Sequence, residues 1–162
     1  MPNSLEIQVG SLLHERGSKL VLAESCTGGL LGSRITDVAG SSEYFLGSVV
    51  AYAYEAKVGL LGVSWDTLNS KGAVSRETVL EMARGARNSM NADISVAVSG
   101  IAGPGGGTPE KPVGTTWIGL VTADGEFAQL FHFASGDREK NKALAVDAAL
   151  QLLLDFLQGN QD

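Results

Sequence analysis

One segment of the chain brings several reactive side chains to the point where a strand gives way to a helix. The apolar run at 20–23 is followed by Glu-Ser-Cys-Thr-Gly-Gly at 24–29, after which helical spacing begins. Such a turn can present a nucleophile, and the free N–H groups of the following helix can bind an anion. Ser25 or Thr27 could equally be an ordinary helix N-cap. The local pattern leaves both readings open.

A serine hydroxyl becomes a useful nucleophile when a base removes its proton. The chain has two histidines, His14 and His132, and both are far from residues 24–29 in sequence. Lys57 lies one turn inside a predicted helix and can serve as the base if burial lowers its pKa. Ser25 and Lys57 are therefore a candidate Ser–Lys dyad, although a lysine at such a position is more often solvated.

Three other segments contain residues that could bind a ligand. Ser42 follows a predicted helix in the turn 40–42, where its alternative role is in a polar turn after a helix C-cap. Ser99 and Gly100 end a buried strand that runs into the glycine-rich loop 103–107, and glycines let backbone approach a phosphate or a planar ring. Arg138 stands at a helix start, where it could bind a phosphate or simply form a surface ion pair. Cys26 is interpreted as a small buried apolar residue.

Composition sets limits on the class of protein. The chain has 162 residues, 44% of them hydrophobic and 19% charged, with a formal net charge of −6. We expect one domain over residues 1–162, no membrane segment and a cytoplasmic location. An acidic chain without a basic cluster is a poor partner for nucleic acid. One cysteine and two histidines offer no metal-ligand spacing, so we expect no metal.

Strand and helix patterns alternate along the chain. We expect strands at 19–23, 47–52, 93–99, 113–122 and 126–133, the last two joined by a hairpin turn at 123–125. Helical spacing covers residues 5–16, 31–38, 55–61 and 64–69, followed by a helix capped by Ser75 and another capped by Asp137. This order predicts a three-layer α/β/α sandwich around a mixed, mostly parallel sheet of five or six strands. Ligands of such sheets gather at the carboxyl ends of the strands.

Six segments, in order along the chain, closely resemble one protein family. They lie at 23–29, 39–42, 72–75, 99–107, 110–114 and 135–138. The family is the C-terminal domain of the competence/damage-inducible protein CinA, which is also found alone as nicotinamide mononucleotide deamidase. The resemblance runs from about residue 20 to residue 157. Because the chain begins at its first predicted helix, we expect it to be the stand-alone form.

The resemblance implies hydrolysis of the carboxamide of nicotinamide mononucleotide to nicotinate mononucleotide and ammonia, in pyridine-nucleotide recycling and without a cofactor. By position, Ser25 resembles the nucleophile, with Ser42 as the alternative, and Lys57 resembles the base. The resemblance also implies Tyr52 as a third catalytic residue, near the reacting amide. The implied substrate-binding residues are Thr27, Gly28, Gly29, Ser42, Ser99, Gly100 and Arg138. The 24–29 turn and Arg138 are expected to hold the substrate's charge. We also expect the protein to form a homo-oligomer, most simply a dimer.

Two departures from the family pattern bear on function. The family usually has Ser or Thr and then Asn at the positions of Ala53 and Tyr54, and Thr at Ser99. The first change could reshape the mouth of the pocket and leaves open a module that binds a pyridine nucleotide without hydrolysing it. A purely interaction-based role in competence or DNA damage has no support in this acidic sequence. The change at Ser99 keeps the hydroxyl group.

Overall fold

A computed structural model describes residues 4–159 of the chain. Its helices are α1 (Leu5–Arg16), α2 (Leu30–Thr36), α3 (Tyr54–Leu61), α4 (Trp65–Lys71), α5 (Arg76–Met90) and α6 (Arg138–Leu157), with a short 3-10 turn η1 (Ser41–Glu43). Its strands are β1 (Leu20–Glu24), β2 (Phe45–Val50), β3 (Ile94–Gly100), β4 (Thr115–Thr122) and β5 (Gly125–His132).

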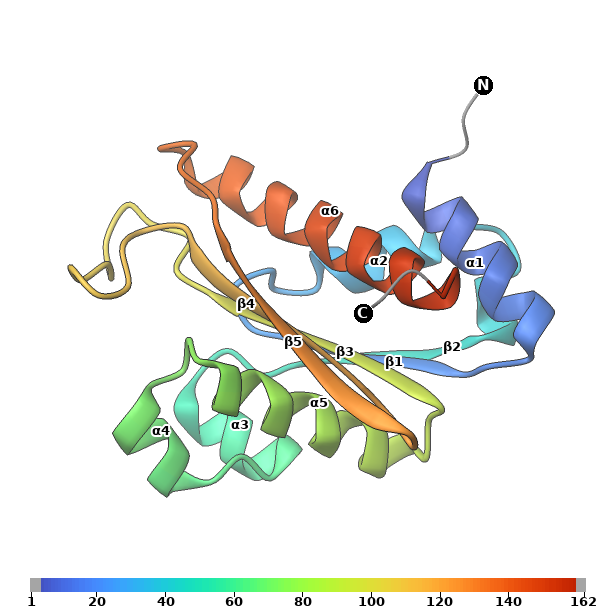
Figure 1. Cartoon of the computed structure of the whole chain (residues 1–162), viewed down its shortest axis with the longest axis horizontal. Coiled ribbons are helices and arrows are strands. Elements are labelled where there is room, and N and C mark those ends of the chain that lie inside the picture. Colours follow the sequence, from blue (N-terminus) through green and yellow to red (C-terminus); the bar gives the residue numbers. More distant parts are fainter. Residues whose placement is uncertain (1–3, 160–162) are drawn as a thin grey trace.

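The five strands form one mixed sheet in the order β2-β1-β3-β4-β5. The pairs β1–β2 and β1–β3 are parallel, whereas β3–β4 and β4–β5 are antiparallel. Of the described strands, β4 therefore runs against the other four. Helices α1, α2 and α6 cover one face of the sheet, and α3, α4 and α5 cover the other (Figure 1). The predicted α/β/α sandwich with a mixed sheet is confirmed.

Burial on both faces explains the near-continuous apolar strands at the centre of the sheet. All five residues of β1 are buried, as are the first six of β3. One apolar cluster packs the sheet against α1, α2 and α6 and includes Leu22 and Leu150, whereas the cluster on the α5 face includes Val79 and Ala97. The two clusters fix the central strands between two layers of helices.

The predicted elements agree with the structure to within a few residues. The strand expected at 47–52 occupies 45–50, and the hairpin contains two residues between the paired ends Thr122 and Gly125. Helix α2 ends at Thr36 rather than 38, and the η1 turn was not predicted. Ser75 and Asp137 cap α5 and α6 as expected, each accepting a backbone N–H three residues ahead.

Chain connections place the carboxyl ends of β1, β2 and β3 at one edge of the sheet. After β1 the chain crosses by α2 to β2 on one side, and then returns through α3–α5 to β3 on the other side. The two connections use opposite faces of the sheet (Figure 1). Such a reversal of strand order leaves a crevice at the strand ends, where open α/β sheets bind ligands.

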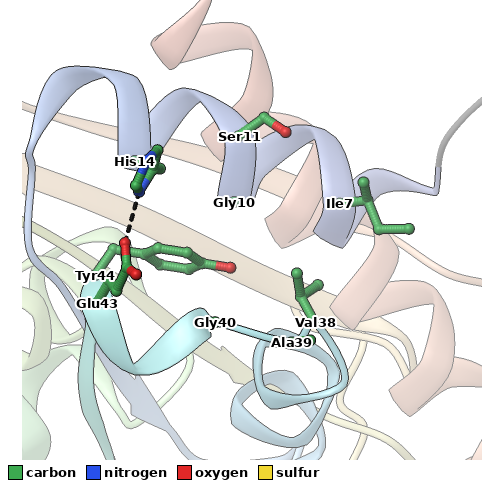
Figure 2. Close-up of a pocket in the computed structure, with 9 residues that line it drawn as sticks. All are labelled: Ile7, Gly10, Ser11, His14, Val38, Ala39, Gly40, Glu43 and Tyr44. Atoms are coloured by element: carbon green, nitrogen blue, oxygen red, sulfur yellow. Dashed lines mark ion pairs between the residues drawn. The ribbon is translucent and has the colours of Figure 1, made fainter.

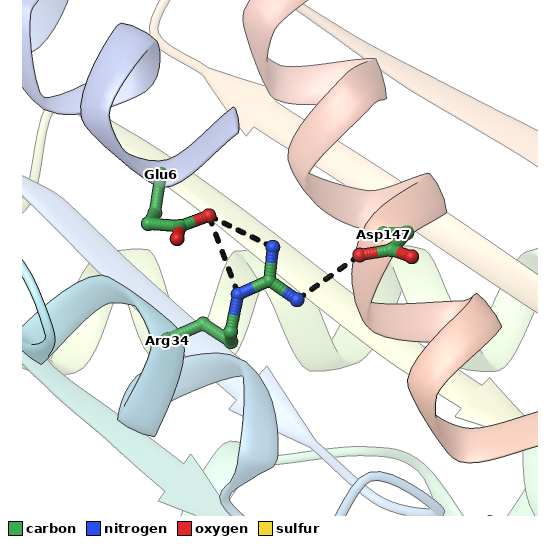
Figure 3. Close-up of polar contacts among 3 residues, drawn as sticks. All are labelled: Glu6, Arg34 and Asp147. Carbon is green, nitrogen blue, oxygen red and sulfur yellow. Dashed lines mark hydrogen bonds and ion pairs between the residues drawn. The ribbon is translucent and has the colours of Figure 1, made fainter. Parts of the chain in front are cut away.

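A charged cluster joins the three helices on one face (Figure 3). The Arg34 guanidinium of α2 contacts Glu6 of α1 at 2.8 Å and Asp147 of α6 at 3.0 Å. These contacts tie the helical layer together.

Within residues 4–159, no helix is long and apolar enough to cross a membrane. The ends of the predicted domain, 1–3 and 160–162, lie outside the described residues.

Candidate active site

A cavity of about 250 Å³ opens at the carboxyl ends of β1 and β3. Its lining includes Ser25, Lys57, Tyr52, Ser99, Gly100 and Arg138. Backbone from the loops after β3 and before α5 completes the wall. Six predicted site residues, from four separate segments of the chain, thus lie around one cavity.

Ser25 and Lys57 contact each other on the floor of this cavity. Lys57 Nζ lies 2.9 Å from Ser25 Oγ, 2.7 Å from the carbonyl oxygen of Tyr52 and 3.0 Å from that of Ala51. The lysine side chain is 1% exposed, and Ser25 is also buried. The contact between Ser25 and Lys57, which was a hypothesis from the sequence, is therefore present in the structure.

Lys57 Nζ lies within hydrogen-bond distance of three oxygens, and as an ammonium it donates to all three, Ser25 Oγ included. As a neutral amine it keeps two N–H groups for the carbonyl oxygens of Ala51 and Tyr52 and can turn its lone pair toward the Ser25 hydroxyl. A proton can thus pass from Ser25 to Lys57 without any rearrangement of heavy atoms.

Burial lowers the pKa of Lys57 from 10.5 to about 8, because the charged form loses its hydration. Among the described residues, no carboxylate lies within ion-pair distance of its Nζ to reverse this effect. The amine is accordingly poised to gain or lose a proton near neutral pH, as a general base requires.

The turn after β1 already holds a carboxylate of the chain itself. The carboxylate of Glu24 folds forward over the start of α2 and accepts hydrogen bonds from the backbone N–H groups of Gly29, Leu31 and Gly32. The side chain of Thr27 also donates to Glu24, at 2.7 Å. The groups that were expected to hold the substrate's charge already have an anionic partner.

Thr27, Gly28 and Gly29 consequently shape the turn and do not line the cavity. Thr27 is buried beside Glu24, and Gly28 and Gly29 have φ angles of 59° and 103°, which favour glycine. They shape the backbone path that carries Ser25, and their predicted role as substrate contacts stays a prediction.

Ser42 lies at the other edge of the sheet. It is exposed in η1, just before β2 begins, whereas Ser25 follows the end of the parallel strand β1. This end of the molecule has its own groove between α1 and residues 38–44, where His14 pairs with Glu43 (Figure 2). Within one chain, Ser42 does not line the cavity that contains Ser25 and Lys57, and its role toward the substrate stays a prediction.

Ser99 and Gly100 also line the cavity. The Ser99 hydroxyl donates to the carbonyl oxygen of Ala73 at 2.7 Å and so holds the segment before α5 against β3. A Cβ on Gly100 would lie 2.5 Å from Thr116 Oγ1 on the neighbouring strand. Glycine is therefore required at this position by the close approach of β4.

Arg138 bridges the mouth of the cavity. Its Nη1 donates to the carbonyl oxygen of Gly103 at 2.7 Å, and its Nη2 donates to the Tyr52 hydroxyl at 3.1 Å. Two of its five N–H groups are used in this way, so the guanidinium retains donors for an anionic ligand. Tyr52 is 61% exposed, and its ring stands at the entrance.

Other nucleophiles and bases suggested by the sequence are poorly placed. Burial raises the pKa of Cys26 to about 11, which keeps it a neutral thiol and agrees with its interpretation as a small apolar residue. His14 pairs with Glu43 in the distant groove, and His132 lies on β5 outside the cavity lining. In the described part of the chain, no group of three or more His, Cys, Asp or Glu side chains could hold a metal.

Two buried residues that support the site were not predicted. Asn141 of α6 donates to the carbonyl oxygen of Ala102 at 3.0 Å and fixes the glycine-rich loop. Glu24 holds the turn on the other side. A signal for Glu24 exists in the sequence: Gly29, at the start of α2, has no side chain to cap the helix, and the nearby carboxylate of Glu24 is an acceptor that can take this role.

Comparison with known proteins identifies the family of the chain. The family model of the CinA C-terminal domain matches residues 2–157 of the sequence. The chain belongs to the CinA C-terminal domain family. Over 155 residues it is 51% identical to a putative competence-damage inducible protein of Halothermothrix orenii, covering 96% of this chain and 38% of that protein. The chain thus spans about two fifths of the length of this larger relative.

A relative of similar length carries the name of an activity. The chain is 48% identical over 155 residues to nicotinamide-nucleotide amidohydrolase PncC of Escherichia coli K12, covering 95% of this chain and 94% of that protein. Among solved structures, competence damage-inducible protein A of Klebsiella pneumoniae matches with a TM-score of 0.92 and 38% identity over 97% of each chain. The CinA-family fold is therefore shared over nearly the whole chain.

Proposed function

We propose that this CinA-family chain hydrolyses the carboxamide of nicotinamide mononucleotide, with Ser25 as the nucleophile and Lys57 as its base. The observation that carries the proposal is the 2.9 Å contact between Ser25 Oγ and the buried Lys57 Nζ inside a cavity. Similarity to a nicotinamide-nucleotide amidohydrolase over 95% of the chain supports a hydrolase that acts on an amide.

The reaction follows from the contacts of the two side chains. Lys57 removes the hydroxyl proton as Ser25 Oγ attacks the carboxamide carbon, giving a tetrahedral intermediate. The C–N bond then breaks as the nitrogen takes the proton from Lys57. Ammonia leaves, and the acyl group stays bound to Ser25 as an ester. A water molecule gives its proton to Lys57 and attacks the ester, which releases nicotinate mononucleotide and restores both side chains.

Arg138 supports a substrate that carries a phosphate. Its guanidinium is at the mouth of the cavity, and its unused N–H groups can donate to phosphate oxygens. Tyr52 shares a hydrogen bond with Arg138, so it is suited to orienting the ligand at the entrance. The role in pyridine-nucleotide recycling stays a prediction.

The alternative, a module that binds the nucleotide without turnover, rests on Ala53 and Tyr54. Both residues lie outside the cavity lining, and the Tyr54 ring packs near Trp65 with ring centroids 6.4 Å apart. The departure from the family pattern therefore leaves the reacting groups in place, which favours the enzyme.

The expected homo-oligomer and cytoplasmic location stay predictions. For the dimer, the exposed edge of β2 is the favoured surface, because it has no charged residue and Leu46 and Val50 are each 43% exposed. Edge strands without charge or proline readily pair with another strand.

The activity is tested by measuring ammonia and nicotinate mononucleotide after incubation with nicotinamide mononucleotide. The proposal predicts both products in equal amounts from the wild-type protein and neither from Lys57→Arg. An arginine keeps a positive charge at position 57, but its guanidinium stays protonated and cannot act as a base. Binding by calorimetry without product would instead support the binding module.

A further inference from the structure

Glu24 is a fully buried carboxylate directly before Ser25, and the proposed chemistry does not use it. Its two oxygens accept five hydrogen bonds. The donors are the hydroxyls of Thr27 and Ser48 and the backbone N–H groups of Gly29, Leu31 and Gly32, at 2.6–3.2 Å. Burying a carboxylate is unfavourable unless it is fully hydrogen-bonded, and here it is.

These bonds join three separate parts of the fold at one point. Glu24 ends β1, Ser48 belongs to the neighbouring edge strand β2, and Leu31 and Gly32 are in the first turn of α2. Gly32 is held so closely that a Cβ there would lie 3.3 Å from Glu24 Oε2. The carboxylate therefore fixes where the chain goes immediately after β1.

The consequence for Ser25 follows from strand geometry. Successive side chains on an extended strand point to opposite faces of the sheet. Glu24, the last residue of β1, bonds the start of α2, and α2 covers the same face of the sheet as α1 and α6 (Figure 1). Ser25 comes next and contacts Lys57 of α3, a helix that covers the opposite face. The backbone N–H of Ser25 also donates to the carbonyl oxygen of Val98, at 3.0 Å, which locks the residue to β3.

The same arrangement keeps the negative charge of Glu24 away from the amine. A carboxylate facing Lys57 would form an ion pair and favour the charged ammonium. By directing its carboxylate to the N-terminus of α2, the chain satisfies Glu24 without making a partner for the base.

We propose that Glu24 is a positioning residue that aims Ser25 at Lys57 by fixing the turn between β1 and α2. This inference rests on the proposed function for the role of Ser25, but not for the identity of the substrate. Its test therefore measures the reactivity of Ser25 itself as well as turnover.

The test compares Glu24→Gln with wild type in two assays, well below the melting temperature of each protein. One assay gives kcat and KM for nicotinamide mononucleotide, and the other gives the rate at which a fluorophosphonate probe labels Ser25, with Ser25→Ala as background. A glutamine presents an amide NH₂ where backbone N–H groups now donate, so the bond from Gly32 is lost in one orientation of the amide and the bonds from Gly29 and Leu31 in the other. We expect kcat and the labelling rate each to fall at least tenfold, with KM within threefold of wild type.

Arg34→Met is the matched control for a loss of stability alone. It removes the contacts of α2 with Glu6 and Asp147 and leaves the contacts of Glu24 intact. We expect a lower melting temperature with unchanged kcat and labelling rate. Ser48→Ala removes one of the five bonds and decides the question if Glu24→Gln does not fold; its labelling rate should fall about threefold.

The outcomes separate the two proposals. If the probe labels Glu24→Gln at the wild-type rate, the positioning role of Glu24 is overturned. If Glu24→Gln does not fold, labelling of Ser48→Ala at the wild-type rate overturns it instead. Normal labelling of wild-type Ser25 without release of ammonia overturns the proposed substrate and leaves the positioning role standing on the labelling rates. Wild-type protein that is labelled no faster than Ser25→Ala overturns both.

Discussion

Replacing Lys57 with methionine should change how the stability of the protein depends on pH. Burial lowers the pKa of the folded-state amine from 10.5 to about 8. Below pH 8 the amine is charged in both the folded and the unfolded protein, and the folded protein bears the full penalty of burying that charge. Between pH 8 and 10.5 the unfolded chain binds the extra proton, so stability rises with pH. Above 10.5 the amine is neutral in both states and the penalty is gone.

The size of the effect follows from the two pKa values. Each pKa unit corresponds to about 1.4 kcal/mol, so the penalty is about 3 kcal/mol. Methionine has a similar length and cannot titrate, but it leaves the carbonyl oxygens of Ala51 and Tyr52 without their donor. Each lost hydrogen bond costs about 1 kcal/mol at every pH. The difference in stability between the two proteins therefore shifts by about 3 kcal/mol with pH, whatever its starting value.

Urea unfolding of wild type and Lys57→Met at pH 7 and at pH 10.5 measures this shift. The ionisation of other lysines and of tyrosines is common to both proteins and cancels in the difference. We expect the wild type to gain about 3 kcal/mol relative to the variant between the two pH values. A difference that changes by less than about 1 kcal/mol would show that Lys57 is charged in the folded protein up to its ordinary pKa, and the argument for a neutral base would fail.

Three further predictions concern the base, the cavity mouth and the core. First, kcat/KM should rise about tenfold per pH unit up to a pKa near 8 and then level off; a flat profile from pH 6 to 9 would exclude Lys57 as the titrating base. Second, Arg138→Ala should raise KM for nicotinamide mononucleotide far more than for its phosphate-free riboside, whereas equal losses would make Arg138 structural. Third, Tyr44→Phe should stabilise the protein by about 1 kcal/mol in thermal or urea unfolding, since in the described chain the buried Tyr44 hydroxyl has no hydrogen-bond partner; a loss of stability would reveal a partner for that hydroxyl.

Much of the fold was predictable because the chain keeps a simple pattern. Apolar strands at 20–24 and 94–100 alternate with amphipathic helices, and this order alone indicates helices on both faces of a sheet. Ser25 and Lys57 could be paired from residue type, since the chain has few bases and the ends of neighbouring parallel strands meet. Arg138 was recognisable as a cation at a helix start.

Other features depend on contacts that sequence spacing does not encode. The turn 24–29 looked like an anion site, because nothing in its pattern shows that Glu24 folds forward to fill that site itself. Ser42 resembled a site residue, but it precedes its strand while Ser25 follows one, and parallel pairing separates them by the length of the sheet. The bridge from Arg138 to Gly103 joins residues 35 positions apart, and only the folded loop brings them together.

Release of ammonia from nicotinamide mononucleotide by wild type, Ser25→Ala and Ser42→Ala tests the central claim most directly. With Ser25 as the nucleophile beside Lys57, Ser25→Ala should lose at least a hundredfold in kcat while still binding substrate, and Ser42→Ala should stay within threefold of wild type. If Ser25→Ala instead retains more than about a tenth of wild-type kcat, a loss of only ~1.4 kcal/mol in the barrier, Ser25 is not the nucleophile.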